Sequence, residues 1–307
     1  MLKIFATRIL IAIPVLIAVA SLTFFLIKLA PGGPFDADRA VSPQVMKNLN
    51  DAYNLNASEW DQYKDYMIGV IQGDFGPSFR YPGRSVTEMI GTGLPVTFEL
   101  ALYALLVALF VGIIAGVLAA LKRNTYFDFI PMAFAMIGIC VPTFLMGPLL
   151  VLIFGITLEV LPVSGWGQLP GDKILPSLTL GFAYAAYIAR LSRGGMLEIL
   201  NQDFIRTARS KGLPENKVVI KHAMQGGLIP VVAFMGPAIA GLLSGSFVVE
   251  TIFQIPGLGR FYVEAAFNRD YTMILGTTIF FSAMIVFFNL LSDLATLWLN
   301  PRSRDSS

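Results

Sequence analysis

Six long apolar runs restrict the possible fold of this chain more than any other feature of its sequence. A helix of about 20 apolar residues crosses the hydrocarbon core of a bilayer. Runs of roughly this length occur at 9–29, 96–121, 129–158, 174–188, 229–249 and 273–299. Charged residues make up 14% of the chain, against roughly 25% in soluble domains. Because a chain in lipid must pair its own backbone polar groups, we predict an all-α membrane protein with six transmembrane helices.

The third and fourth runs are irregular. Pro142 and the pair Gly147 and Pro148 interrupt the third. Neighbouring helices can satisfy the carbonyl groups freed at such breaks, and broken helices often line a pathway. Proline is also simply common in membrane helices, so both interpretations stay open, and these three residues are candidates for lining a path. The fourth run is short unless its helix continues past Arg190.

Small residues are concentrated in the fifth run, which predicts a helix that packs closely and centrally. Glu99 lies near the outer end of the second run, where it can reach the interface or line a cavity. Asp293 interrupts the apolar face of the sixth run. It is an intramembrane acid unless that part of the helix lies near the inner surface.

A polar island, residues 202–224, separates the fourth and fifth runs. The acid Asp203 suits the start of a helix, which we predict at 203–211. Phe204, Ile205 and Ala208 give that helix an apolar stripe. Gly212 can take the left-handed conformation that ends a helix. Pro214 then suits the first turn of a second helix.

Basic residues dominate the stretch from 190 to 221, which predicts a cytoplasmic location. Its seven cations are Arg190, Arg193, Arg206, Arg209, Lys211, Lys217 and Lys221, and its three acids are Glu198, Asp203 and Glu215. With basic residues also near both ends of the chain, the pattern predicts cytoplasmic termini. A solvated loop that only sets topology needs no apolar stripe. The stripe therefore favours docking into the groove of a partner.

The island resembles the EAA loop of binding-protein-dependent ABC importer permeases, in the variant seen in oligopeptide and dipeptide permeases. The resemblance rests on RTARSKGL at 206–213, followed by HAM at 222–224. Arg206 stands where the general pattern has Glu, Thr207 and Ala208 stand at its Ala positions, and Gly212 matches its glycine. The Ile-x-Leu-Pro part of the general pattern is not matched, whereas the peptide branch commonly has His-Ala-Leu at that point.

Further segments extend the resemblance over almost the whole chain. LAPGGPF at 29–35 and GDFGPSF at 73–79 resemble the first outer loop of peptide permeases. The stretch 250–271, which ends in NRDY at 268–271, resembles their last outer loop. Asn300-Pro301 replaces the Asp-Pro usual near the end of the family.

The resemblance implies a type I ABC importer permease fold with a cytoplasmic coupling helix, in a bacterial inner membrane. It implies four kinds of partner: a second homologous permease, two ATPase subunits that bind ATP and Mg²⁺, an extracytoplasmic peptide-binding protein, and the peptide itself. This chain would bind no cofactor and no nucleic acid, and lipid would surround it. Phe204 and Ile205 would be apolar anchors in the ATPase. The full set of ATPase-coupling candidates is Asp203, Phe204, Ile205, Arg206, Thr207, Ala208, Arg209, Lys211, Gly212 and Leu213.

The expected organisation has three parts. Residues 1–30 form the N-terminal tail and first transmembrane helix, and 31–93 an extracytoplasmic loop or cap with helices near 43–53 and 59–72. Residues 94–307 form the core permease, with five transmembrane helices and the coupling loop at 190–225. Which cargo is carried stays open, because related permeases also carry nickel chelates, glutathione and antibiotic peptides.

The sequence disfavours enzymes and ion-coupled transporters. It contains no phosphate-binding P-loop pattern, so any ATPase resides in another subunit. One cysteine, Cys140, and one histidine, His222, leave no basis for a metal cluster or a catalytic triad, and we interpret His222 as a solvated loop residue. An ion-coupled secondary transporter is the alternative function. It would favour an internal repeat and midplane acids, and we find no repeat and only Asp293 as such an acid.

Overall fold

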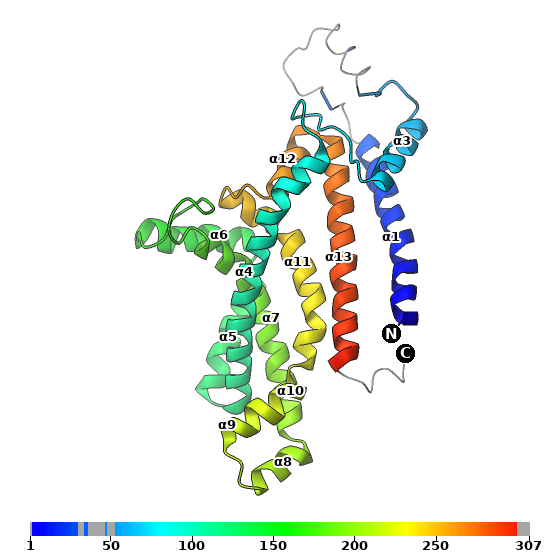
Figure 1. The fold of residues 1–307 in the computed structure, drawn as a ribbon. Helices are drawn as coiled ribbons and strands as arrows, with labels where there is room; N and C mark the ends of the chain where they lie inside the picture. The colour runs from blue at the N-terminus through cyan, green and yellow to red at the C-terminus, as the bar shows by residue number, and fades with distance from the viewer. Residues whose placement is uncertain (1, 30–33, 36–46, 48–52, 300–307) are drawn as a thin grey trace. The chain divides into compact units, whose positions relative to one another are not determined.

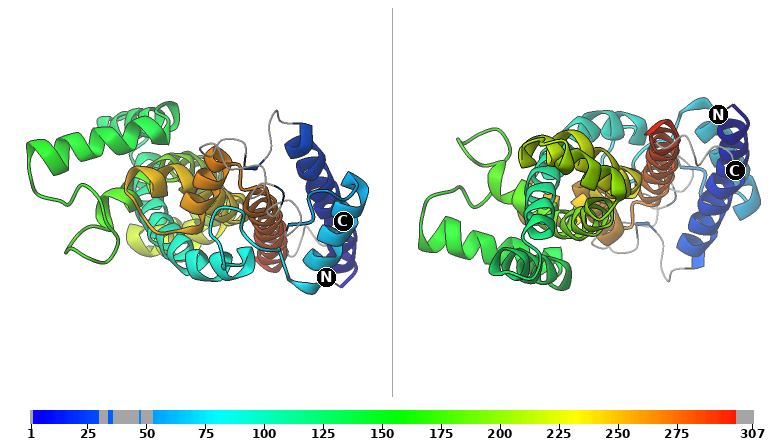
Figure 2. Two further views of the ribbon diagram at one scale, coloured as in Figure 1. Left: turned by 90° about the horizontal axis from the view of Figure 1, so that it is seen from above. Right: turned by 90° about the horizontal axis from the view of Figure 1, so that it is seen from below.

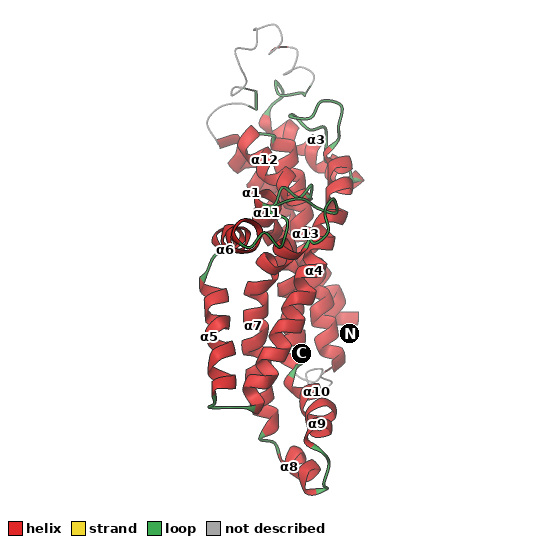
Figure 3. Ribbon diagram, turned by 90° about the vertical axis from the view of Figure 1, so that its left-hand side faces the viewer, coloured by secondary structure: helices red, strands yellow, loops and turns green. Residues whose placement is uncertain are grey.

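The computed structural model describes residues 2–29, 34–35, 47 and 53–299. Within these ranges the regular elements are helices (Figure 3). The predicted helix near 43–53 and most of the segment 29–35 lie outside the described residues, as does the pair Asn300-Pro301. The chain divides into two compact units, of which one comprises Phe98–Ile255 with Ile285–Ser307 and the other Leu2–Thr97 with Pro256–Met284.

In the first unit, α7 (Ile174–Leu200) packs against α5 (Tyr126–Cys140), α6 (Thr143–Leu150) and α11 (Ile229–Ile252) (Figure 1). The fourth run, 174–188, was predicted to be short unless its helix continues past Arg190, and α7 does continue past that residue. The helix continues past Arg190 because its buried face continues: Ile188, Ser192 and Met196 are each fully buried at four-residue spacing. The Ser192 hydroxyl donates to the Ile188 carbonyl at 2.8 Å, so burial costs it no hydrogen bond.

The third predicted span is broken at Pro142, as expected. α5 ends at Cys140, α6 starts at Thr143, and the two directions differ by 112°. Figure 2 shows α6 and the π-helix η1 (Val151–Thr157) as the green segment that leaves the end of α5. Gly147 and Pro148 do not interrupt the helical structure a second time. Helix α6 includes both residues and leads directly into η1. Among the described residues, five helices are long and apolar enough to cross a membrane, and six if the bent pair counts as one span.

Helix α11 packs closely, as its small residues predicted. A Cβ atom added at Gly236 would lie 2.4 Å from the Cβ atom of Ser292, and one added at Gly241 would lie 2.1 Å from the hydroxyl of Tyr184. Both distances are shorter than any ordinary contact. Glycine at these positions therefore allows the close helix contacts of this unit.

The contacts of Glu99 favour a position at the membrane interface over a role in lining a cavity. Its carboxylate accepts a hydrogen bond from the Trp166 indole at 3.0 Å and pairs with the Lys173 ammonium at 2.6 Å. Both partners lie in the segment that leads into α7. Asp293 is partly buried on α13 (Tyr271–Leu299), directly after Ser292.

The second unit contains α1 (Leu2–Leu29), α3 (Glu59–Gln72), α12 (Leu258–Asn268) and the first parts of α4 (Val86–Leu121) and α13. The predicted helix at 59–72 is confirmed. Ser58 caps its start by accepting from the Asp61 amide at 3.2 Å, and Gly73 ends it with a φ of +80°. Such a left-handed cap is the usual role of a glycine after a helix.

The predicted outer loop at 250–271 contains the helix α12, which was not predicted from the sequence. An apolar face drives its formation: Leu258 and Ala265 are buried in a cluster with Val86, Met89 and Met273. A short loop still precedes it, and Gly257 stands directly before its first residue.

Asp270 joins two segments that are far apart in the sequence. Its buried carboxylate accepts from the Ser78 hydroxyl and from the backbone N–H groups of Phe79 (3.1 Å) and Arg80 (3.2 Å). It also accepts from the Met273 amide at 3.2 Å, at the start of α13. The motifs GDFGPSF and NRDY thus meet at one carboxylate, which satisfies several donors that burial would otherwise leave unpaired.

Candidate coupling surface at residues 203–213

Helix α8 (Asp203–Ser210) forms the predicted short helix of the polar island and lies beyond the end of α7 (Figure 1). Its start follows a tight turn after α7. The Gln202 carbonyl accepts from the amides of Ile205 (3.1 Å) and Arg206 (3.3 Å). Asp203 places a negative charge in the first turn, where the helix dipole favours it.

The end of α8 is a complete Schellman motif, with Lys211 as the C-cap residue, so the helix is one residue shorter than predicted. The Leu213 amide donates to the Ala208 carbonyl at 3.4 Å, and the Gly212 amide donates to the Arg209 carbonyl at 2.9 Å. These are the two bonds that define the motif. Gly212 has a φ of +73°, which confirms the prediction of a left-handed glycine.

Pro214 was predicted to lie in the first turn of the second helix, but that helix begins one residue after it. It precedes the short helix α9 (Glu215–Lys217) instead of belonging to its first turn. Its carbonyl accepts from the amides of Lys217 (2.9 Å) and Val218 (3.1 Å). Proline is favourable here because its missing N–H group would have no partner in the new helix.

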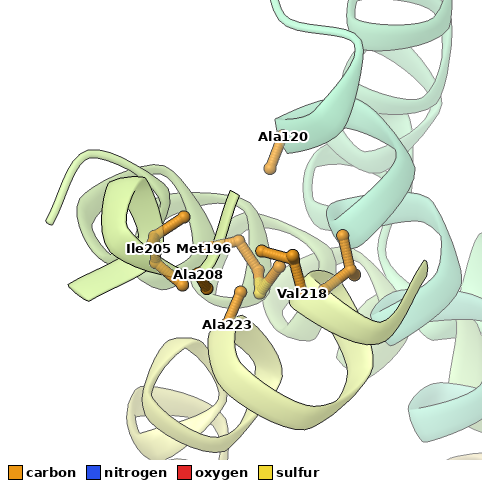
Figure 4. Close-up of a cluster of buried hydrophobic side chains, with 7 residues drawn as sticks. Ala120, Met196, Ile205, Ala208, Val218 and Ala223 are labelled. Carbon is orange, nitrogen blue, oxygen red and sulfur yellow. The ribbon is translucent and has the colours of Figure 1, made fainter. Parts of the chain in front are cut away.

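The inward face of α8 is buried in a cluster that we call the coupling core (Figure 4). Ile205 is 0% exposed and Ala208 is 7% exposed. The cluster also takes in α4, α7 and the π-helix η2 (Val218–Ala223). Its members are Ala120, Met196, Ile205, Ala208, Val218, Val219 and Ala223. The short helix is therefore seated on its own chain by apolar contacts.

The outward face of α8 is polar. Asp203 and Arg206 have side chains that are 95% and 73% exposed, and Thr207 is exposed beside them. At 100° per residue these positions lie opposite Ile205 and Ala208. Phe204 lies at the edge of the buried face and is 50% exposed. Ile205, which was predicted to be an apolar anchor, has its side chain buried in the coupling core of this chain. Phe204 is available.

Arg209 closes the loop after α8 by pairing with Glu215. Its Nη2 and Nε atoms donate to the two carboxylate oxygens at 2.6 and 3.1 Å. The carboxylate raises the pKa of Arg209, and the guanidinium lowers the pKa of Glu215. Both side chains are partly exposed, so the pair contributes geometry more than stability.

Sequence reasoning missed two contacts of α7, the helix on which α8 is seated. A Cβ atom added at Gly195 of α7 would lie 2.2 Å from the Gly227 carbonyl oxygen, so α10 (Met224–Gly227) approaches α7 through bare backbone. The paired glycines at 194–195 and 226–227 were a signal for this contact. Asp128 and Arg193 form an ion pair between α5 and α7, although the sequence predicted Arg193 to lie in the coupling loop at 190–225.

The three candidate path residues differ in their surroundings. Pro142 and Pro148 are exposed, whereas Gly147 is buried, where an added Cβ atom would contact Ile252 at 3.3 Å and Thr179 at 3.4 Å. Gly147 therefore acts in helix packing in this unit. In the described part of the chain, no group of three or more His, Cys, Asp or Glu residues could hold a metal ion.

Comparison with known proteins relates most of the chain to one family. Residues 108–305 match the family model described as binding-protein-dependent transport system inner membrane component. The oligopeptide transport system permease protein OppB of Salmonella typhimurium is 44% identical over 305 residues, covering 99% of this chain and 100% of the relative. The dipeptide transport system permease protein DppB of Bacillus subtilis is 42% identical over 287 residues, covering 94% and 93%.

Solved structures show a similar fold. A chain of the MetNI methionine ABC transporter in an inward-facing conformation aligns with a TM-score of 0.59 at 16% identity, covering 69% of this chain and 96% of that chain. A chain from an amino acid ABC transporter with histidines aligns with a TM-score of 0.51 at 17% identity, covering 68% and 94%.

Proposed function

Because this chain belongs to the family of binding-protein-dependent transport system inner membrane components, we propose that it carries oligopeptides or dipeptides into the cell. Its fold is that of the type I ABC importer permeases, and it is a transport subunit. The cargo is proposed from the peptide permeases to which the chain is similar over nearly its full length.

The coupling surface transmits the motion of an ATPase partner in this proposal. The observation that carries it is the seating of α8: Ile205 and Ala208 are buried in the coupling core, while Phe204, Arg206 and Thr207 stay exposed. A helix held on one face and free on the other can fit a groove of a partner. Because the coupling core includes residues of α4 and α7, force on α8 would reach the long helices.

The remaining parts of the machine follow from the family. A second homologous permease completes the path, two ATPase subunits bind ATP and Mg²⁺, and an extracytoplasmic binding protein delivers the peptide. In this proposal the coupling surface and both chain termini are cytoplasmic, which the basic residues of α8 and its neighbours, and those near each chain end, favour. Pro142, between α5 and α6, and Gly147 and Pro148, within α6, remain candidates for the path.

The test is purification of the tagged chain from native membranes, with measurement of ATP hydrolysis. We expect a second permease and ATPase subunits to copurify, and we expect a peptide-loaded binding protein to stimulate hydrolysis. A chain that purifies alone and moves substrate under an ion gradient without ATP would instead establish the secondary transporter.

A matched pair of variants locates the coupling surface. Phe204→Ala removes the exposed aromatic side chain of α8. Phe267→Ala removes an exposed aromatic side chain of α12, and the Phe267 residue is 83% exposed. We expect Phe204→Ala to lower the recovery of ATPase subunits several-fold, since aromatic anchors dominate many interfaces, and Phe267→Ala to leave it unchanged. Equal recovery in both variants would contradict the role of Phe204.

A further inference from the structure

Helix α3 carries a row of large apolar side chains that its own unit does not cover. Trp60 is 56% exposed, Ile68 54% and Ile71 82%. At 100° per residue the three fall within a narrow sector of the helix. Lys64 lies in the same sector, with its ammonium group 5.7 Å from the centre of the Trp60 ring. A Trp and a Lys beside aliphatic residues are typical of helices at a membrane surface.

The opposite side of α3 is fixed to α1 within the apolar part of that helix. The Tyr63 hydroxyl lies 2.7 Å from the Ser21 hydroxyl, and the Lys28 ammonium donates to the Gln62 side chain at 2.6 Å. The Tyr63 ring stacks on Phe25 at 5.5 Å between centroids. Ser21 belongs to the candidate membrane span 10–29.

These contacts set the depth of α3. Ser21 lies eight residues before Leu29, which corresponds to about 12 Å along a helix. The hydrocarbon core is only about 30 Å thick, so Tyr63 lies within one leaflet. The middle of α3 is at a similar level, because the ring centres of Tyr66 and of Phe24 on α1 lie 6.4 Å apart.

We infer that α3 is an interfacial helix immersed in one leaflet of the membrane, with Trp60, Ile68 and Ile71 among lipid acyl chains. The occupant of this face is lipid because α3 is bonded to the candidate membrane span 10–29, whose Leu22 and Leu26 side chains are each 63% exposed as well. On the orientation in the proposed function, this is the outer leaflet.

The test uses single cysteines in the assembled transporter. Cys140 is first replaced by alanine, and Ile68→Cys and Ile71→Cys are compared with Asp61→Cys and Asp65→Cys, two exposed acids on the same helix. A charged, membrane-impermeant maleimide is added to intact cells. We expect the two isoleucine positions to react at least tenfold more slowly than the two aspartate positions.

Lipid contact is then measured directly. A fluorophore at Ile71→Cys should be quenched strongly by phospholipids brominated on the acyl chain, and one at Asp61→Cys weakly. Equal labelling and equal quenching at these positions would overturn the inference. So would protection of Ile71→Cys that appears only when the binding protein is added, since that protein would then be the occupant.

The two proposals can fail separately. Quenching by lipid with labelling from the cytoplasmic side alone would retain the interfacial helix and reverse the proposed orientation. Loss of ATPase coupling in a correctly labelled protein would affect the proposed function alone.

Discussion

Asp128 and Arg193 form a two-point ion pair between α5 and α7, with Nε–Oδ1 and Nη2–Oδ2 distances of 2.6 and 2.8 Å. The Asp128 side chain is 2% exposed, and the backbone amide of Asn124 also donates to it at 3.0 Å. Arg193 lies one turn before Met196, a member of the coupling core. The pair thus ties the start of α5 to the part of α7 on which α8 is seated.

Replacing Asp128 should destabilise the protein more than replacing both partners. Asp128→Asn leaves a charged guanidinium in a largely buried place, and we expect a loss of about 2 kcal/mol, reduced because Arg193 regains some water. The double variant Asp128→Leu with Arg193→Met should recover most of this loss. Thermal unfolding in detergent measures both. Equal stability of Asp128→Asn and the unmodified protein would contradict the structural role of the pair.

Ile205 and Phe204 should have separable effects. Ile205→Ala leaves a cavity in the coupling core, and we expect a cost of about 2–4 kcal/mol to the seating of α8. Limited proteolysis between residues 201 and 214 should then become faster. Phe204→Ala, at the exposed edge, should leave proteolysis unchanged and reduce ATPase recovery. If both variants resist proteolysis equally, the coupling core is not what holds α8.

The effect of a substitution at Gly212 should depend on how readily the new residue takes the left-handed backbone conformation, and not on the size of its side chain. No atom lies within 4 Å of a Cβ atom added there, so space is available. The left-handed conformation costs an ordinary residue about 1–2 kcal/mol, Asn less, and a β-branched residue most. We expect peptide import to fall in the order Gly, Asn, Ala, Val. Import by Gly212→Val at the unmodified rate, with a normal yield of complex, would refute the need for this helix stop.

The contribution of Glu215 to the stability of the fold should disappear at acidic pH. Arg209 lowers the pKa of this carboxyl, so its stabilising effect is present above the ordinary pKa of Glu and is lost as the pH falls through the lowered value. The expected effect is small, about 0.5 kcal/mol, because the pair is partly exposed. Unfolding temperatures of the unmodified protein and Glu215→Gln should differ at pH 7 and converge below about pH 4. A difference that persists at low pH would exclude the ion pair as its cause.

Local signals in the sequence were sufficient for the boundaries of several elements. Helix α3 was predicted near 59–72 and lies there, with a capping serine before it and a glycine after it. Helix α8 was predicted to within one residue, and Gly212 was assigned its left-handed conformation. Pro142 was predicted to interrupt the third span. Each of these depends on groups within a few residues of one another, so the printed sequence already contains the determinants.

The sequence by itself determined that this chain is helical, apolar and built to cross a membrane, and that a polar island carries a short striped helix. Tertiary structure decided what each stripe touches. Ile205 belongs to the chain's own core and Phe204 does not, Arg193 pairs with Asp128 65 residues away, and Asp270 binds a loop 190 residues earlier. An apolar stripe has the same periodicity whether its own chain or a partner covers it. The choice depends on contacts between distant segments, which only the folded chain brings together.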